Sequence, residues 1–205
     1  MGQVTSGIRA IFSNPIIYST FQNIMGAHHF RVGFVEEFVR PISGCAILDI
    51  GCGPADILTH LPDVDYCGFD ISDAYIARAR NRFGERGKFF SKILTYADIA
   101  AMPKFDIVLA LGLLHHLDDE SAITILQLAS QALKPGGRLV TFDPCFDAKQ
   151  HLVSRFLVGA DRGQNVRTKA GYTAIANEVF ETPRIVIRHR AWIPYTQCFM
   201  ECTQK

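Results

Sequence analysis

The residues best suited to chemistry lie in the stretch AILDIGCGPADIL, residues 46–58. The carboxylate of Asp49 follows an aliphatic run, and Gly51 and Gly53 then predict a sharp turn where the backbone comes close to a ligand. A glycine-rich turn after a strand usually holds a nucleotide, often by its phosphates. A dinucleotide-binding turn would place a third glycine at position 56, where this chain has Asp56. Two carboxylates beside a pyrophosphate would repel it, so the stretch favours a ligand that is positively charged at this end.

Alternating strands and helices are expected to position this turn. Short β-branched or aromatic runs predict strands, and the segments between them carry helix-capping signals. The expected strands are 45–50, 65–70, 88–93, 105–111 and 138–143; the expected helices are about 54–61, 72–83, 118–133 and 169–180. The segments RIVIRHRAWI and YTQCFMECTQ then predict an antiparallel hairpin around Pro194. The sequence therefore predicts an α/β fold with a mostly parallel sheet and an antiparallel edge.

In a sheet of this kind, ligands bind in the crevice outside the carboxyl ends of the strands. The residues at those ends are 49–53, Asp70, the loop 111–116 and Asp143. We expect the functional site to be built from them.

The N-terminal part of the chain has a different texture. Residues 1–43 are rich in aromatic and aliphatic side chains, and Phe30, Phe34 and Phe38 recur at helical spacing. The strand–helix alternation begins only after them. These residues are expected to form a helical extension, separate from a globular unit at 44–205.

Composition limits the kind of protein. The 205 residues suit one domain, and the net charge of +1 gives no global attraction to nucleic acid or membrane. Six cysteines without CxxC or zinc-like spacing predict free thiols and no metal site. With no secretory signal or membrane span in the sequence, a cytoplasmic protein is expected. Residues 151–205 hold eight Lys or Arg against four Asp or Glu, a local charge of +4.

Five segments in order resemble the motifs of class I S-adenosylmethionine-dependent methyltransferases. They are LDIGCGPAD, YCGFDIS, ADIAAMPKFDIV, LALGLLHHLDD and ALKPGGRLVTFDP, and the likeness covers roughly residues 44–144. The resemblance implies a Rossmann-like, doubly wound, seven-stranded sheet with S-adenosylmethionine as cofactor. It also implies that residues 1–43 form a lid, although packed core is an equally open interpretation, and that about 145–180 covers the substrate. One departure is Ala55, where many members have a third glycine; because alanine is nearly as small, little consequence is expected.

The resemblance assigns cofactor contacts to particular residues. In these enzymes the glycine turn packs against the methionine part of the cofactor, so Asp49 would face its cationic groups. Asp70, 19 residues after Gly51, would accept hydrogen bonds from the ribose hydroxyls, and Ile71 would flank the adenine. The expected set is Asp49, Gly51, Cys52, Gly53, Asp70 and Ile71, with Asp98 and Ile99 near adenine and the carbonyl of Leu111 near the ammonium group. A turn without ligand, or for Asp98 and Ile99 a solvated loop, is the structural alternative.

Catalytic and acceptor-binding residues are less well defined. His115 and His116 could supply a general base, because histidine titrates near neutral pH. Either ring could instead pack and cap the backbone, and alignment of the acceptor with the activated methyl group could suffice without a base. Within GADRGQNVRTKAGY, Arg162 and Arg167 suit a carboxylate or phosphate, unless Asp161 pairs with one of them at the surface. The expected acceptor-binding residues are Tyr18, Arg162, Arg167, Tyr172 and Tyr195.

The predicted function is methyl transfer to a small-molecule acceptor that is anionic or lipid-like. The alternative is a non-catalytic S-adenosylmethionine-binding module or partner subunit. The missing third glycine disfavours a nicotinamide-dependent oxidoreductase. The neutral charge and the absence of an N/D-P-P-Y/F motif disfavour a nucleic-acid methyltransferase. A monomer or homodimer without nucleic-acid partners is expected.

Overall fold

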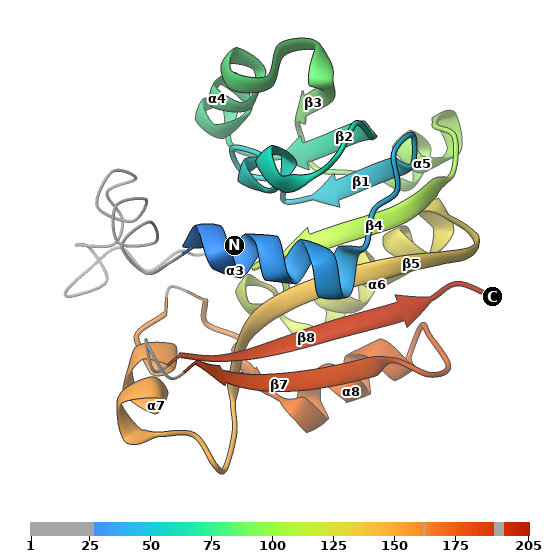
Figure 1. Ribbon diagram of the computed structural model, residues 1–205. Coiled ribbons are helices and arrows are strands. Elements are labelled where there is room, and N and C mark those ends of the chain that lie inside the picture. The colour runs from blue at the N-terminus through green and yellow to red at the C-terminus, as the bar shows by residue number, and fades with distance from the viewer. Residues whose placement is uncertain (1–26, 162, 191–194) are drawn as a thin grey trace.

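The computed structural model describes residues 27–161, 163–190 and 195–205. Tyr18 and Arg162 of the expected site lie outside these residues. The described chain forms a single mixed sheet with helices on both of its faces (Figure 1).

The sheet follows the predicted α/β plan. Its strand order is β3-β2-β1-β4-β5-β8-β7, and the short β6 pairs with β5 beside this path. Strand β8 is antiparallel to both β5 and β7, whereas the other pairs are parallel. The bounds are β1 Ala46–Ile50, β2 Asp65–Asp70, β3 Gly87–Ser91, β4 Phe105–Leu111, β5 Leu133–Phe146, β6 Arg167–Thr168, β7 Arg184–Arg190 and β8 Tyr195–Thr203. The mostly parallel sheet with an antiparallel C-terminal hairpin is confirmed; the two-residue β6 brings the expected seven strands to eight.

The helices flank this sheet. Helices α4, α6 and α8 are those expected, and Ser72 and Asp118 cap the first two through their side chains. The segment expected as a helix at 54–61 is only a 3-10 turn, η2. Helices α5 and α7 were not predicted. The bounds are α3 Ala27–Phe34, η1 Val35–Val39, η2 Asp56–His60, α4 Asp73–Phe83, η3 Gly84–Arg86, α5 Tyr96–Ala101, η4 Leu114–His116, α6 Asp119–Ala132, α7 Leu152–Gly159 and α8 Lys169–Asn177.

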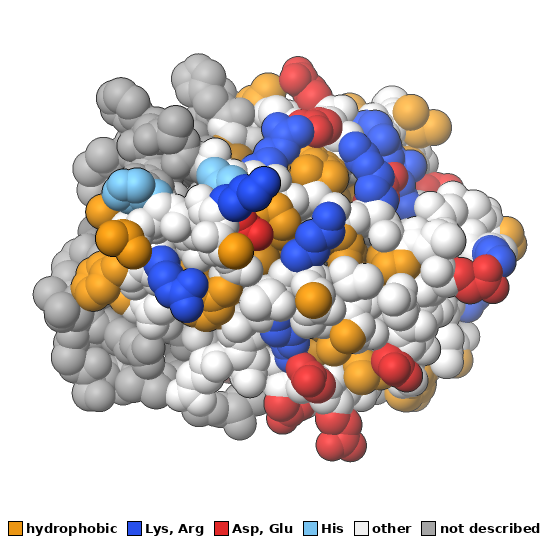
Figure 2. Space-filling view, turned by 90° about the horizontal axis from the view of Figure 1, so that it is seen from below, with side chains coloured by type: hydrophobic (Ala, Val, Ile, Leu, Met, Phe, Trp, Pro, Cys, Tyr) orange, Lys and Arg blue, Asp and Glu red, His pale blue; other side chains and the backbone are white. Residues whose placement is uncertain are grey.

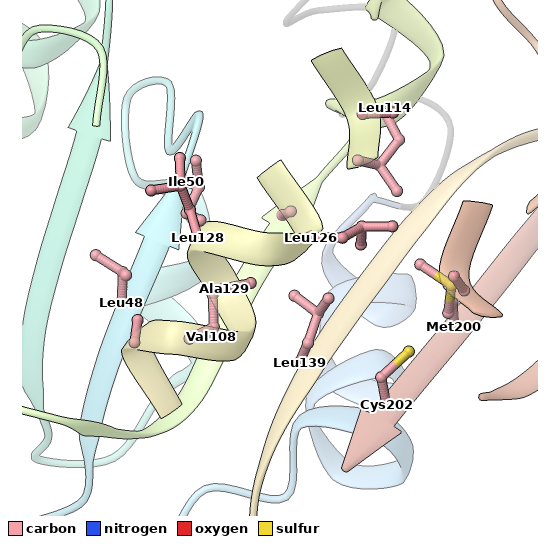
Figure 3. Packing of buried hydrophobic residues seen from close by; sticks show 14 of the residues in the cluster. Leu48, Ile50, Val108, Leu114, Leu126, Leu128, Ala129, Leu139, Met200 and Cys202 are labelled. Carbon is pink, nitrogen blue, oxygen red and sulfur yellow. The ribbon is translucent and has the colours of Figure 1, made fainter. Parts of the chain in front are cut away.

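A hydrophobic cluster lies on each face of the sheet, because successive side chains of a strand point to opposite faces. In β1, Ile47 packs with α3 and η1, whereas Leu48 packs with α6 on the other face. The cluster that contains Ile47 is called the first cluster and the one that contains Leu48 the second. Figure 3 shows part of the second cluster, in which Leu126 and Ala129 of α6 lie against residues of β1, β4 and β5. The central strands are therefore buried on both sides.

The described part of the N-terminal extension belongs to the first cluster. Helix α3 and the π-helical turn η1 cross one face of the sheet (Figure 1). Phe30 and Phe34 meet the Phe142 ring edge-on, and Phe38 stacks on Phe199 at 4.7 Å. Residues 30–39 thus supply core packing, the second of the two open interpretations for this region.

Candidate functional site

The glycine turn joins β1 to η2 at the carboxyl end of the sheet. Gly51 and Gly53 have φ values of 73° and 54°, which a side chain at either position would strain. The backbone N–H groups of Gly51 and Cys52 both donate to the carbonyl of Phe69, at 2.8 and 3.0 Å. A Cβ on Gly51 would lie 3.1 Å from the side chain of Leu113. The turn is therefore fixed between the end of β2 and the loop after β4.

Ala55 also has a left-handed backbone, with φ 55° and ψ 35°, and is fully buried. This conformation costs a residue with a Cβ roughly 1–2 kcal/mol. The sequence predicted that alanine in place of glycine would matter little here, but that prediction considered only the size of the side chain. What glycine would relieve here is backbone strain rather than crowding.

Asp49 has a buried carboxylate with one oxygen unpaired. The hydroxyl of Tyr66 donates to its Oδ2 at 2.6 Å, whereas Oδ1 has no hydrogen-bond partner among the described residues. Burial raises the pKa of Asp49 to about 7; the charge of Asp70 adds to this rise, and the Tyr66 bond opposes it. A buried unpaired oxygen is costly unless a ligand satisfies it. Its place beside the glycine turn fits a cationic group.

Asp70 connects the end of β2 to the turn. Its Oδ2 accepts from the backbone N–H of Gly53 at 2.9 Å, and its Oδ1 accepts from that of Ser72 at 2.8 Å. Each carboxylate oxygen can accept a further hydrogen bond. The neighbouring Ile71 is 64% exposed. The structure thus brings Asp49, Asp70 and Ile71 together around the turn, as expected.

One other acid and a thiol near the turn have internal partners. Asp56 pairs with Arg82 at 2.5 Å and with Arg31 at 3.5 Å, so its charge is compensated within the chain. The Cys52 thiol packs over β2, where a Cβ on Gly68 would lie 2.8 Å from its Sγ. Burial raises the pKa of this thiol well above its usual range. Cys52 is thus placed to offer backbone, not a thiolate, to a ligand.

Asp98 and Ile99 both serve helix α5. Asp98 accepts from the backbone and hydroxyl of Thr95 in a capping box, and the nearby Lys92 ammonium lowers its pKa most. Ile99 is 5% exposed and packs in the cluster with α6. The solvated loop that was the alternative here is wrong, because the segment is helical; the contact of Asp98 and Ile99 with adenine stays a prediction.

His115 lies between two carboxylates after β4. Its Nδ1 is 2.8 Å from Oδ1 of Asp143, at the end of β5, and its Nε2 is 3.2 Å from Oδ1 of Asp161. The ring is 5% exposed, and the His116 ring lies 4.0 Å from it, centroid to centroid. The ring is packed, as in the expected alternative, but its nitrogens meet two carboxylates and not the backbone. Sequence reasoning noted Asp143 and Asp161 but did not connect either with His115.

Arg167 and Tyr172 have structural roles. All five N–H donors of Arg167 are used within the chain: by the carbonyls of Leu114, Leu117 and Asn165 and twice by Asp119. Tyr172 is 1% exposed and donates to the carbonyl of Pro144. Neither side chain is free to bind an acceptor, which corrects the expectation for both. The salt bridge that was the alternative for Arg167 exists, but with Asp119 rather than Asp161.

Part of the positive charge of the C-terminal region lies on the edge strand β7. Figure 2 shows Lys and Arg side chains on the face seen from the β7 side. Arg184 and Arg188 each stack over Phe38 at 5.7 Å and pair with Glu201 and Glu37, respectively. Charged side chains on a free edge strand hinder unwanted strand pairing. This part of the +4 charge therefore needs no anionic acceptor to explain it.

Within the described ranges, no group of three metal-ligating side chains occurs. No helix in this part of the chain is long and apolar enough to cross a membrane.

Comparisons with known proteins agree with the geometry of the turn. Residues 48–139 match the model of a methyltransferase domain family. The chain contains a class I S-adenosylmethionine-dependent methyltransferase domain. This domain spans β1 to β5 and includes Asp49, the glycine turn and Asp70.

Relatives of the methyltransferase domain act on small molecules. The 27-O-demethylrifamycin SV methyltransferase of Amycolatopsis mediterranei is 35% identical over 108 residues, which cover 49% of this chain and 39% of that protein. The ubiquinone biosynthesis O-methyltransferase of Idiomarina loihiensis is 28% identical over 142 residues, which cover 66% of this chain and 55% of that protein. The chain therefore matches only about two fifths to one half of these relatives' length.

Solved structures share the fold. The pyocyanin biosynthetic protein PhzM aligns with a TM-score of 0.69 at 16% identity, over 98% of this chain and 62% of that one. The plantazolicin methyltransferase BpumL, solved with a desmethyl substrate analogue and SAH, aligns with a TM-score of 0.63 at 15% identity, over 96% of this chain and 94% of that one. At such identities the likeness shows the fold of the methyltransferase domain.

Proposed function

We propose that this chain binds S-adenosylmethionine and transfers its methyl group to a small-molecule acceptor. The observation that carries the proposal is the unpaired, buried Oδ1 of Asp49 beside the glycine turn. A pyrophosphate would be repelled there, whereas an ammonium group would satisfy the oxygen. The family of the domain and the names of its relatives support the same cofactor and reaction.

The residues around the turn fit the parts of this cofactor. Asp49 would take the ammonium group, Asp70 has acceptor capacity left for ribose hydroxyls, and the exposed Ile71 offers an apolar surface to adenine. We retain Gly51, Cys52, Gly53 and Leu111 as backbone contacts.

The cofactor supplies a methyl group already activated on a sulfonium, so the chain need only bind, orient and shield the reactants. Fixing the glycine turn between β2 and the loop after β4 provides that orientation. Because the ubiquinone biosynthesis relative named above is an O-methyltransferase, we favour a hydroxyl acceptor. Helix α7 exposes Leu152, Val153 and Phe156, which supports an acceptor with an apolar part. We expect the protein to work in the cytoplasm as a monomer or homodimer.

Calorimetry with S-adenosylhomocysteine, S-adenosylmethionine and NAD tests the cofactor. We expect micromolar affinity for the first two and none measurable for NAD. Asp70→Ala should weaken binding by about 1–3 kcal/mol, roughly 5- to 150-fold, because two hydroxyls lose a charged acceptor. Asp65→Ala, at the exposed opposite end of β2, is the matched control and should bind normally. Tight NAD binding, or normal binding by the Asp70 variant, would refute this site.

A non-catalytic binding module is the second candidate. Incubating the protein with isotope-labelled S-adenosylmethionine and a metabolite extract, then searching for labelled products, separates the two. Cofactor binding without any labelled product would favour the module.

A further inference from the structure

The ring of His115 has both of its nitrogens occupied by carboxylates from different elements. Asp143 comes from β5 and is 1% exposed, whereas Asp161 comes from the segment that follows α7. The two nitrogen–oxygen distances are 2.8 and 3.2 Å. A third donor, the backbone N–H of His115, points at the same oxygen of Asp143, at 3.1 Å.

This arrangement favours a doubly protonated ring. An ionised carboxylate only accepts hydrogen bonds, so each ring nitrogen must carry a proton to bond to its partner. Burial raises the pKa of Asp143, whereas the ring bond, the charge and the backbone N–H of His115 each lower it and so favour the ionised carboxylate. Burial alone would lower the pKa of His115, but the bonds from Asp143 and Asp161 outweigh it and raise the pKa to about 9. Three titratable groups lie beside the ring: Asp143, Asp161 and His116. Two more act on these carboxylates: the Tyr195 hydroxyl donates to Asp161, and the charge of Arg167 lowers the pKa of Asp143.

The same contacts hold a segment of backbone against the ring. The hydroxyl of Tyr195 donates to Oδ2 of Asp161 at 2.6 Å, and the N–H of Gly163 donates to Oδ1 at 2.9 Å. The N–H of Asn165 donates to the carbonyl of His115 at 3.0 Å. A Cβ on Gly163 would lie 2.0 Å from Cδ2 of His115, so only glycine allows this approach.

The segment is fixed at its far end as well. Arg167 donates to the carbonyls of Leu114 and Leu117, which flank His115 in the chain. The loop that receives these bonds begins at the end of β4, and its Leu113 touches the glycine turn. A displacement of the segment would therefore reach the proposed cofactor site through this loop.

We propose that His115 is a positioning residue and not a general base: its imidazolium forms a clasp that holds Asp161 and residues 163–167 against the loop after β4. The inference deepens the proposed function and rests on it. With its Nε2 proton held by Asp161, His115 has no lone pair to accept a proton from an acceptor. The proton of a hydroxyl acceptor then leaves to water, or the acceptor reacts as an anion.

Nitrogen-15 NMR of the histidine rings in the full chain tests the clasp. In the wild type we expect both ring nitrogens of His115 to be protonated at pH 7.5, with a titration midpoint near pH 9. Asp161→Asn removes one charge but keeps the shape, and should lower the midpoint by at least one pH unit. Asp147→Asn is the matched control, because Asp147 pairs with His189 at the same 3.2 Å outside the clasp. This variant should leave the His115 midpoint unchanged.

Amide hydrogen exchange reports the segment itself. In Asp161→Asn and Tyr195→Phe we expect the amides of Gly163 and Asn165 to exchange at least tenfold faster than in the wild type. His115→Gln should do the same and, combined with Asp161→Asn, add little, because both break one clasp. If the His115 variant does not fold, the other two variants still decide the question.

A neutral ring with an unprotonated Nε2 at pH 7.5, or an unchanged midpoint in Asp161→Asn, would overturn the inference. Binding of S-adenosylhomocysteine by the same samples separates this result from the fate of the proposed function. A clasp seen without ligand binding contradicts only the proposed function, whereas ligand binding with a freely titrating His115 contradicts only the clasp.

Discussion

Replacing Asp49 with asparagine should stabilise the ligand-free protein at alkaline pH. Burial raises the pKa of this carboxyl from 3.8 to about 7. A carboxyl with a raised folded-state pKa makes the fold less stable as pH rises from about 4 through about 7, because ionisation is easier in the unfolded chain. This rise of about three pKa units lowers the free energy of unfolding of the wild type by at most ~4 kcal/mol at pH 8. The new amide N–H₂ lacks an acceptor and costs ~1–3 kcal/mol, so a net gain of ~1–3 kcal/mol remains.

The same variant should bind the cofactor product more weakly. Loss of a charge-assisted hydrogen bond costs ~1.5–3 kcal/mol, about 10- to 100-fold in affinity for S-adenosylhomocysteine. In the wild type, protonation of Asp49 below its pKa should reduce the affinity roughly tenfold between pH 8 and pH 6. The Asp49→Asn protein has no such titration, so its affinity should stay flat over this range.

Thermal denaturation and calorimetry at pH 5, 6 and 8 measure both effects. The melting temperature of the variant should exceed that of the wild type by several degrees at pH 8 and lose this advantage at pH 5. Asp106→Asn is a useful contrast, because Lys134 lowers the pKa of Asp106. Loss of this paired carboxylate should destabilise the fold at pH 8. If the Asp49→Asn protein is destabilised equally at all pH values and its ligand affinity is unchanged, the reasoning about Asp49 is refuted.

Substitutions at three further positions test other parts of the chain. Arg167→Ala should lower the free energy of unfolding by ~2–4 kcal/mol in denaturant titrations, because the carbonyls of Leu114 and Leu117 lose their donor; an unchanged midpoint would contradict this role. Ala55→Val should destabilise by more than ~2 kcal/mol, because a β-branched residue is poorly tolerated in a left-handed backbone, whereas Ala55→Gly should stay within ~1 kcal/mol of the wild type in the same titration. If the acceptor is anionic, Arg162→Ala should raise its KM about tenfold without changing cofactor affinity; equal steady-state KM values would remove Arg162 from the acceptor site.

The sheet could be predicted from sequence because its strands are buried on both faces and bounded by turn residues. Leu48 and Ile47 face opposite clusters, so β1 appears as a continuous apolar run. Helix α7 gave no such signal, since Leu152 and Phe156 are exposed and its apolar side chains follow no core-facing stripe. At η2, the left-handed Ala55 precedes the first turn and only a short 3-10 segment follows, which a helical pattern at 54–61 does not reveal.

The cofactor end of the site was likewise accessible from the sequence, because topology brings the ends of neighbouring parallel strands together. The positions of β1 and β2 were enough to predict that Asp49 and Asp70 lie close together. The partners of Arg167 and Asp161 come from distant elements: Arg167 bonds Leu114, 53 residues away, and Asp161 bonds Tyr195, 34 residues away. Sequence spacing cannot identify such pairs, and arginines that suit an anion suit backbone carbonyls equally well.

The two most deeply buried acids at this end of the sheet differ in what accompanies them. Each has one buried oxygen without a hydrogen-bond partner among the described residues, Oδ1 in Asp49 and Oδ2 in Asp143, but Asp143 also has the His115 ring as a cationic partner within the chain. The neighbours that act on Asp49, Tyr66 and Asp70, bring no positive charge. A buried carboxylate without a cation lowers stability, and proteins retain such costs mainly where function requires them. The charge at Asp143 is thus explained by the fold, whereas the charge at Asp49 is best explained by a cationic ligand.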